Sequence, residues 1–289
     1  MTANDRPEVK KKGRFNIIAS VRKHYRAYLV GLFACYVMLV GLVYVFQRRI
    51  LHFPARYDHA TLLRRVTAIH GALWPNGEAY RGILFAPAPE KCRGTILLFH
   101  GNAGSATNNV FYAKQLVPFG FRVILAEYAG YGNRAGALDE QSLAADVGAS
   151  IRLAYEQFGP PVFLIGESLG TGLAAAGYAH AQTPVAGIVL IAPWDKLIHV
   201  AQAVYWFLPA TSILKDAYDS EANLKPFAGP LAIIQASNDG LIPAAATTRL
   251  FESFQGKKRL WKLEGATHWS WSEFADAAFW TQLTDYLTK

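Results

Sequence analysis

Short apolar runs alternate with longer segments of helical periodicity after residue 78, and this alternation constrains the fold most strongly. Several runs are apolar throughout, as strands buried on both faces are, and the segments between them are long enough for crossover helices. We therefore predict an α/β fold with a mostly parallel twisted sheet and helices on both faces. The predicted strands cover residues 78–85, 95–99, 122–127, 162–165, 187–191, 231–235 and 259–263.

Helical periodicity marks residues 139–158, 169–181 and 272–287 between or after these strands. The connection 194–229 is too long for an ordinary loop and is rich in aromatic residues. Because it follows the end of a predicted strand, we expect it to form a short helical cap over a site at that edge of the sheet.

Residues 28–46 contain no charged side chain, and 19 helical residues nearly cross a hydrocarbon layer of about 30 Å. We predict one transmembrane helix at about residues 26–46. A cleaved signal peptide would end in small residues, but Gln47 and Arg48 follow, so the segment is predicted to be an uncleaved signal anchor. A buried core helix is the alternative. The predicted domains are a basic tail with this helix, 1–49, and a globular domain, 50–289.

The formal net charge is +8, and the segment 1–49 carries all of it, since the remaining chain holds equal numbers of basic and acidic residues. This distribution favours a membrane surface over a nucleic acid as the partner of the basic arm. Seven Lys/Arg precede the apolar run and five follow it, which favours a cytoplasmic N-terminus and a globular domain on the opposite side. Cys35 and Cys92 provide no disulfide framework.

Residues 162–170 read Val-Phe-Leu-Ile-Gly-Glu-Ser-Leu-Gly and place a Gly-x-Ser-x-Gly motif between an apolar strand and a helix. In this context the serine lies on a sharp turn that exposes its hydroxyl, and the flanking glycines relieve crowding. An ordinary glycine-rich turn is the alternative in a chain with 24 glycines. The strand before the motif and the helix after it favour Ser168 as a nucleophile.

A serine hydroxyl becomes a strong nucleophile when an imidazole accepts its proton and a third group orients the imidazole. Asp239 follows the predicted strand 231–235, and His268 follows the strand 259–263. Both residues therefore lie beyond the carboxyl ends of strands, where open α/β sheets build their sites. We predict Ser168, Asp239 and His268 as the catalytic residues, in the chain order Ser, Asp, His.

Asp195 is the alternative acid, because it also follows a predicted strand, 187–191. Its other expected role is to cap the first helix of the 194–229 insertion. The remaining histidines precede the nucleophile, lie at a helix end, or lie in the insertion, so His268 is the predicted base.

Acyl transfer also requires hydrogen-bond donors for the developing oxyanion. We predict the backbone N–H groups of Leu169, at the helix start, and Asn102, in the loop after strand 95–99, and expect His100 to have a structural role. Apolar side chains of the insertion are expected to line the substrate pocket, the alternative being that they cover the sheet edge. The predicted pocket residues are Trp194, Tyr205, Trp206 and Phe207, together with Trp269 beside the base.

Together these motifs resemble the membrane-anchored alpha/beta-hydrolase-domain-containing proteins of bacteria and eukaryotes. The likeness covers roughly Gln47 to the C-terminus, and it implies the α/β-hydrolase fold and a serine hydrolase with neither a metal nor an organic cofactor. Esterases and thioesterases are among the relatives. Two departures are Ala129, where the family usually has Arg, and Trp269, where it usually has Asn. The matching segments are 47–54, His100–Asn102, Glu127–Gly132, Gly166–Gly170, Asp219–Ser220 and the Asp239 and His268 loops.

The expected reaction is hydrolysis of an ester or thioester of an apolar acyl group through an acyl-enzyme on Ser168. The expected partners are a small-molecule or lipid-like acyl substrate and the lipid bilayer, with no nucleic acid, metal or cofactor. A serine peptidase of the same fold is one alternative, although the insertion offers only scattered charges for a peptide terminus. A non-catalytic membrane scaffold is the other.

Overall fold

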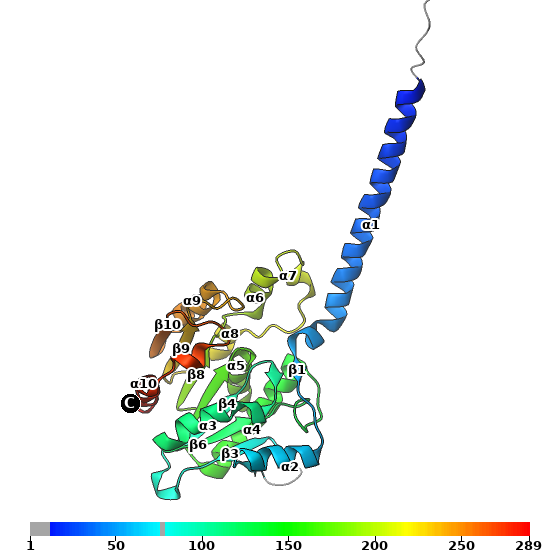
Figure 1. Cartoon of the computed structure of the whole chain (residues 1–289). Helices are drawn as coiled ribbons and strands as arrows, with labels where there is room; N and C mark the ends of the chain where they lie inside the picture. Colours follow the sequence, from blue (N-terminus) through cyan, green and yellow to red (C-terminus); the bar gives the residue numbers. More distant parts are fainter. Residues whose placement is uncertain (1–11, 76–78) are drawn as a thin grey trace, which may run out of the picture. The chain divides into compact units, whose positions relative to one another are not determined.

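The computed structural model of the chain describes residues 12–75 and 79–289, and for residues 12–22 it describes the backbone alone. The chain divides into two compact units, residues 1–47 and residues 48–289. The helix α1 (Lys12–Leu51; Figure 1) contains the described part of the first unit, and its last residues, 48–51, belong to the second. Glu78, at the start of the first predicted strand, lies outside the described residues, as does the tail before Lys12.

Within α1, the stretch Lys23–Leu51 is long and apolar enough to cross a membrane, with a mean hydropathy of 2.5. Its large side chains are exposed, among them Leu32 and Phe33. Among the described residues this apolar stretch is not buried on any side, and it has the surface expected of a lipid-facing segment.

Among the described residues, an eight-stranded sheet has the order β10-β9-β8-β7-β4-β6-β3-β2 (Figure 1). Every neighbouring pair from β10 to β6 is parallel, and β3 runs antiparallel to both β6 and β2. The predicted mostly parallel sheet is therefore confirmed. The strands are β2 (Ala72–Trp74), β3 (Gly82–Phe85), β4 (Gly94–Phe99), β6 (Phe121–Ala126), β7 (Val162–Glu167), β8 (Gly187–Ile191), β9 (Leu231–Ala236) and β10 (Lys258–Leu263).

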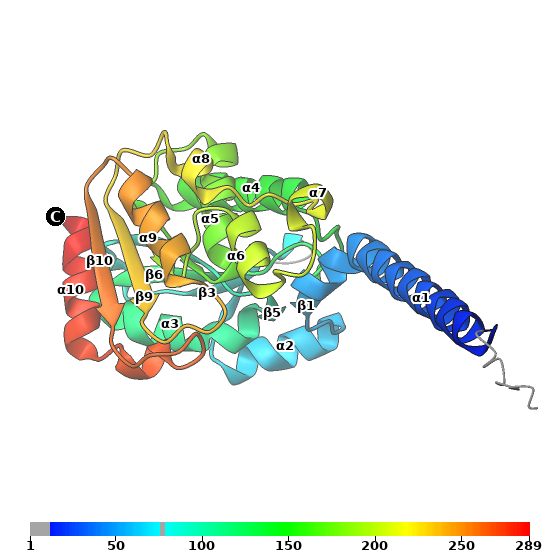
Figure 2. The same cartoon turned by 90° about the horizontal axis from the view of Figure 1, so that it is seen from above.

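Helices cover both faces of the sheet (Figure 2). Leu98 packs in one buried cluster and its neighbours Leu97 and Phe99 pack in the other, because successive strand residues point to opposite faces. One cluster includes α4 (Glu140–Phe158), α5 (Leu169–Ala181) and α9 (Ala244–Ser253). The other includes α2 (His59–Ala68), α3 (Val110–Leu116) and α10 (Ala277–Thr288).

A second, very small sheet lies beyond the carboxyl edge of the main one. β1 (Phe53–Pro54) runs parallel to β5 (Ala103–Gly104), with Phe53 opposite Ala103. Neither strand was predicted, since two residues provide no periodicity from which a strand can be recognised.

The insertion after β8 folds into short helices, as its predicted role as a cap requires. They are α6 (Leu197–Val204), α7 (Ala210–Ile213) and α8 (Ser220–Leu224). Two carboxylates attach its middle part to the rest of the domain. Glu140 accepts hydrogen bonds from the N–H groups of Ala217 and Tyr218 at 2.6 and 2.9 Å, and Asp216 pairs with Arg48 at 2.9 Å.

The predicted closing helix 272–287 is split. A short 3-10 turn, Trp271–Phe274, precedes α10, and Asp276 lies between them. The Asp276 carboxylate accepts a hydrogen bond from the Phe279 N–H at 2.8 Å, so it caps a new helix and stops the earlier turn from continuing.

Candidate active site

Ser168 lies between the end of β7 and the start of α5, at the carboxyl edge of the sheet. Its φ of 51° and ψ of −118° are unusual for a residue with a side chain, a conformation that costs of order 1–3 kcal/mol. Close packing maintains the turn: a Cβ on Gly170 would collide with the carbonyl of Phe99, and a Cβ on Gly166 would collide with the carbonyl of Gly170. The glycines of the motif therefore hold the serine at a strained strand-to-helix turn.

The structure brings the three predicted catalytic side chains into one hydrogen-bonded chain. His268 Nε2 lies 3.0 Å from Ser168 Oγ, and His268 Nδ1 lies 2.8 Å from Asp239 Oδ2. Asp239 and His268 lie on the loops after β9 and β10, which are neighbours in the sheet. Ser168 and His268 are both buried, so the link between them is shielded from competing water.

The Asp239 carboxylate remains charged although it is largely withdrawn from water. Burial raises its pKa, but the hydrogen bond from His268 and those from the N–H groups of Ile242 and Leu241 lower it by more, and the net pKa is below the usual value. Both N–H groups lie 2.8 Å from Oδ1, which leaves Oδ2 for the imidazole. An ionised acceptor at Nδ1 favours the tautomer in which Nε2 is free to accept the serine proton.

Asp195, the alternative acid, has different partners. Its carboxylate pairs with Arg249 Nε at 2.6 Å and with His199 Nδ1 at 2.7 Å. Burial raises its pKa, but hydrogen bonds from Arg249, the Lys196 N–H and His199 lower it by more, so the net pKa is below the usual value. Asp195 was expected to cap α6, but the capping position is Lys196, whose side chain makes no capping hydrogen bond. Asp195 instead connects α6 to α9, because His199 lies in α6 and Arg249 lies in α9. This link could not be predicted from the sequence, because Arg249 lies 54 positions away from Asp195.

The loop after β4 approaches the nucleophile from the neighbouring strand. A Cβ on Gly101 would lie 3.7 Å from Ser168 Cβ, so a side chain at this position would contact the serine, and the glycine leaves this space open. Asn102 follows directly. Leu169 is the first residue of α5, where N–H groups have no partner within the helix. The assignment of the Asn102 and Leu169 N–H groups as oxyanion donors stays a prediction.

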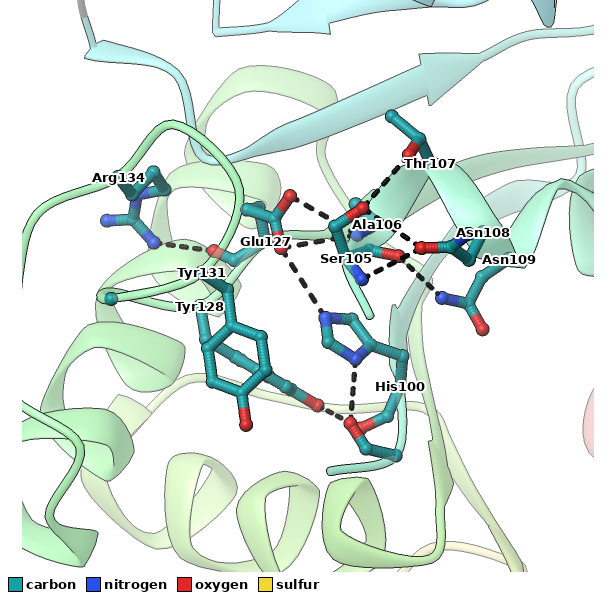
Figure 3. A network of polar contacts seen from close by, with 12 residues as sticks. His100, Ser105, Ala106, Thr107, Asn108, Asn109, Glu127, Tyr128, Tyr131 and Arg134 are labelled. Carbon is teal, nitrogen blue, oxygen red and sulfur yellow. Dashed lines mark hydrogen bonds and ion pairs between the residues drawn. The ribbon is translucent and has the colours of Figure 1, made fainter. Parts of the chain in front are cut away.

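A buried polar network supports this loop (Figure 3). Glu127 is 1% exposed and accepts hydrogen bonds from the Ala106 N–H at 3.2 Å, while His100 Nε2 lies 3.5 Å from its carboxylate. The Tyr128 hydroxyl donates to the His100 carbonyl at 2.6 Å. His100 is therefore engaged in holding the loop, as expected for a structural residue.

Sequence reasoning missed the partners of Glu167, the residue before the nucleophile. Its carboxylate accepts hydrogen bonds from the Tyr112 hydroxyl at 2.5 Å and from the Trp271 indole N–H at 2.9 Å. Trp271 follows His268 by three residues, so Glu167 connects the turn that carries the serine to the loop that carries the base. Two sequence features could have indicated this link: the acidic Glu167 inside the Gly-x-Ser-x-Gly motif, and the indole donor of Trp271 three residues after His268.

The predicted pocket residues fall into two groups. Trp194 is buried in the core, and its indole N–H lies 3.3 Å from the Tyr218 carbonyl. Tyr205, Trp206, Phe207 and Trp269 are exposed, Trp206 by 81% and Trp269 by 76%. The Trp269 ring lies against the His268 ring, with centroids 4.8 Å apart. The exposed rings therefore belong to the surface of the insertion and of the His268 loop, and Trp194 belongs to the core.

Within residues 12–75 and 79–289, no group of three or more His, Cys, Asp or Glu side chains is arranged to hold a metal ion. The chemistry that the arrangement supports directly is proton transfer from a serine hydroxyl to an oriented imidazole.

The chain is similar to known hydrolases in sequence and in fold. Residues 90–210 match a family described as serine aminopeptidase, S33. An uncharacterized protein of Mycobacterium tuberculosis is 30% identical over 227 residues, which cover 77% of this chain and 80% of that protein. The lysophosphatidylserine lipase ABHD12 of Gallus gallus is 27% identical over 217 residues, which cover 65% of this chain and 56% of the lipase. This chain thus matches about half the length of that lipase.

Two solved structures show the same fold. Est1E from Butyrivibrio proteoclasticus, with ferulic acid bound, is 14% identical with a TM-score of 0.58, and the match covers 71% of this chain and 94% of Est1E. The monoacylglycerol lipase from Paleococcus ferrophilus is 18% identical with a TM-score of 0.54, and the match covers 73% of this chain and 99% of the lipase. The chain therefore belongs to the alpha/beta-hydrolase family.

Proposed function

We propose that Ser168, His268 and Asp239 form a catalytic triad that hydrolyses a carboxylic ester or thioester with an apolar acyl group. The observation that carries this proposal is the unbroken chain of hydrogen bonds at 3.0 and 2.8 Å across three separate strand ends. The strained backbone of Ser168 supports it, because such strain persists where the surrounding structure maintains a functional geometry.

In the first half of the reaction, Ser168 Oγ attacks the carbonyl carbon and its proton moves to His268 Nε2. Asp239 stabilises the resulting imidazolium through Nδ1. The negative charge that forms on the carbonyl oxygen is stabilised by the N–H groups of Asn102 and Leu169. His268 then gives its proton to the leaving alcohol or thiol, the bond to the leaving group breaks, and the acyl group remains on Ser168.

The second half repeats these steps with water as the nucleophile. His268 removes a proton from a water molecule, the hydroxide attacks the acyl-enzyme, and the same N–H groups stabilise the oxyanion. The proton returns from His268 to Ser168 Oγ as the carboxylic acid leaves. Each group ends in its starting state, so the cycle needs no further reactant.

The proposed substrate is a lipid-like ester. One relative is a lysophosphatidylserine lipase, and one structural neighbour is a monoacylglycerol lipase. Trp269, beside the proposed base, and the exposed rings of the insertion, Tyr205, Trp206 and Phe207, offer apolar surface to an acyl chain. A bound chain would cover rings that are otherwise in contact with water, which favours long acyl groups.

We also propose that α1 anchors the protein in a bilayer as a single transmembrane helix of about residues 26–46. Its length, its hydropathy and its exposed apolar side chains support this role. The excess of basic residues before the helix favours a cytoplasmic N-terminus, with the catalytic domain on the opposite side.

The matched family description makes an aminopeptidase the second candidate. Such an enzyme needs a carboxylate that is available to a substrate ammonium group. The acids on the neighbouring strand ends are already engaged: Glu167 by Tyr112 and Trp271, and Asp195 by Arg249. This engagement favours an ester over a peptide.

The two functions are separated by assaying the detergent-solubilised protein on p-nitrophenyl esters of increasing chain length and on aminoacyl p-nitroanilides. We expect hydrolysis of the esters, with kcat/KM rising with chain length, and no release from the anilides above the Ser168→Ala control. Hydrolysis of the anilides but not of the esters would show that the protein is a peptidase rather than an esterase. Equal ester hydrolysis by the wild type and Ser168→Ala would refute the triad.

A further inference from the structure

The segment that follows α1 is hydrogen-bonded directly to the loop beside the nucleophile. The Asn102 side-chain amide donates to the carbonyl of Leu51, the last residue of α1, at 2.9 Å. The Phe53 N–H then donates to the Asn102 carbonyl at 2.8 Å, and the Ala55 N–H donates to the Gly104 carbonyl at 2.8 Å. Residues 51–55 and 102–104 thus form one ladder, whose centre is the β1–β5 pair.

His52 and Tyr131 form a second connection between the two segments of this ladder. The Tyr131 hydroxyl donates to the Asn102 carbonyl at 2.8 Å, and His52 Nδ1 lies 3.0 Å from the same hydroxyl oxygen. Because the hydroxyl proton is used on Asn102, the His52 Nδ1–H is the donor to Tyr131. Both side chains are buried, so these links are not exposed to competing water.

A second loop holds residues 55–57 on their other side. The Gly132 N–H donates to the Ala55 carbonyl at 2.9 Å, and the Tyr57 N–H donates to the Gly132 carbonyl at 3.1 Å. The segment after α1 is therefore fixed between two loops that both belong to the globular domain. It is part of the scaffold of the site rather than a free tether.

Asn102 connects the segment 51–55 to the proposed reaction. Its backbone N–H is the proposed oxyanion donor, and the preceding residue, Gly101, is near enough to Ser168 that a Cβ added to it would contact the serine Cβ. Contacts to residues 51–53 and Tyr131 hold the Asn102 side chain and carbonyl. The peptide that carries the Asn102 N–H is held from its other end, because its carbonyl, on Gly101, lies 2.8 Å from His100 Nδ1. The N–H group therefore lies between two fixed points. A donor contributes most when it is already oriented toward the oxyanion.

We infer that residues Leu51–Ala55 are a positioning element for the oxyanion loop, so that the segment leaving the membrane helix sets the geometry of acyl transfer. This inference rests on the proposed function. Asn102, through its side chain, and Tyr131 are the positioning residues that connect the segment to the loop. Loss of either connection should leave substrate binding nearly intact and slow the chemical steps, because only the transition state uses the oriented donor.

The test compares two variants of the full-length protein in detergent with the wild type. Tyr131→Phe removes only the hydroxyl that joins His52 to Asn102, and Asn102→Ala removes the amide that binds Leu51 while retaining the backbone N–H. We expect kcat for a p-nitrophenyl ester to fall about tenfold or more in each, with KM within about twofold, since loss of an entire oxyanion donor costs about 10²–10³. Tyr286→Phe is the matched control, because its hydroxyl lies 3.3 Å from a carbonyl in β9, away from the loop.

A trifluoromethyl ketone provides a second readout, because its adduct with Ser168 carries an oxyanion. Its affinity should fall by the same factor as kcat/KM in both variants and stay unchanged in Tyr286→Phe. If both variants keep wild-type kcat and inhibitor affinity, the inference is wrong while the triad stands. A wild type that neither hydrolyses esters nor binds the ketone would instead refute the proposed function. If Tyr131→Phe did not fold, Asn102→Ala would decide the test.

Discussion

Replacing His52 with Asn should make the folded domain less sensitive to acid. His52 is buried beside Tyr131, and its Nε2 has no hydrogen-bond partner in the described structure. Burial lowers the pKa of His52 from 6.5 to about 4, and nearby Asp216 only partly offsets this. An Asn side chain can still donate a hydrogen bond to the Tyr131 oxygen, but it does not bind a proton in this pH range.

The magnitude follows from proton linkage. Between pH 7.5 and pH 5 the unfolded chain protonates His52, whereas the folded domain, with a pKa of about 4, does not. Acidification therefore favours the unfolded state. Since each pH unit between the two pKa values corresponds to about 1.4 kcal/mol, this step removes about 2 kcal/mol of unfolding free energy. The contribution is fully present above pH 6.5 and is lost as the pH falls toward 4.

Guanidinium unfolding of the full-length protein in detergent, followed by tryptophan fluorescence at pH 7.5 and 5, measures this difference. The wild type should lose about 2 kcal/mol more than His52→Asn between the two pH values. His59→Asn, a change at an exposed histidine, should lose as much as the wild type. Equal losses in the wild type and His52→Asn would show that His52 takes up its proton in the folded state, and the reasoning would be refuted.

Further substitutions test the site and its surroundings. Asp239→Asn should lower kcat about 10⁴-fold, as the corresponding change does in a Ser-His-Asp triad, whereas Asp195→Asn should have a minor effect on kcat. If instead Asp195→Asn had the large effect and Asp239→Asn the small one, the catalytic acid would be Asp195, after β8. Trp206→Ala should lower kcat/KM for an octanoyl ester about tenfold relative to an acetyl ester, because truncation removes contacts that only the long chain makes, and equal losses on both esters would assign the ring a structural role. Gly170→Ala should yield no folded protein, because the added Cβ collides with the Phe99 carbonyl; a soluble, active variant would contradict the packing at the turn.

The order of strands and helices could be predicted from the sequence because the central strands are buried on both faces. Runs such as 187–191 coincide with the observed β8, and the helix predicted at 169–181 coincides with α5. The catalytic residues could be proposed for the same reason: Ser168, Asp239 and His268 each follow a recognisable strand, and parallel strands place their carboxyl ends at one edge.

Contacts between distant short segments could not be predicted. The β1–β5 pair joins two residues to two others about 50 positions later, without periodicity in either. The Glu167 carboxylate meets Tyr112 and Trp271 across 55 and 104 positions, and Arg249 reaches Asp195 across 54. Such links depend on where loops return in space, which local pattern does not specify.

The exposure of the aromatic residues could not be predicted from the sequence either. Tyr205–Phe207 and Trp269 were predicted to line the substrate pocket, but an amino-acid sequence does not distinguish a ring that faces a pocket from one that faces solvent. In the structure these rings are exposed, although apolar side chains of this size are more often buried.

The most direct test of the proposed function is covalent labelling of the full-length protein with a fluorophosphonate, followed by mass spectrometry of the labelled peptide. We predict one phosphonyl adduct on Ser168, formed much faster in the wild type than in His268→Ala and absent in Ser168→Ala, because the serine is nucleophilic only when His268 accepts its proton. Labelling at another residue, or labelling that persists unchanged in Ser168→Ala, would contradict the assignment of the nucleophile.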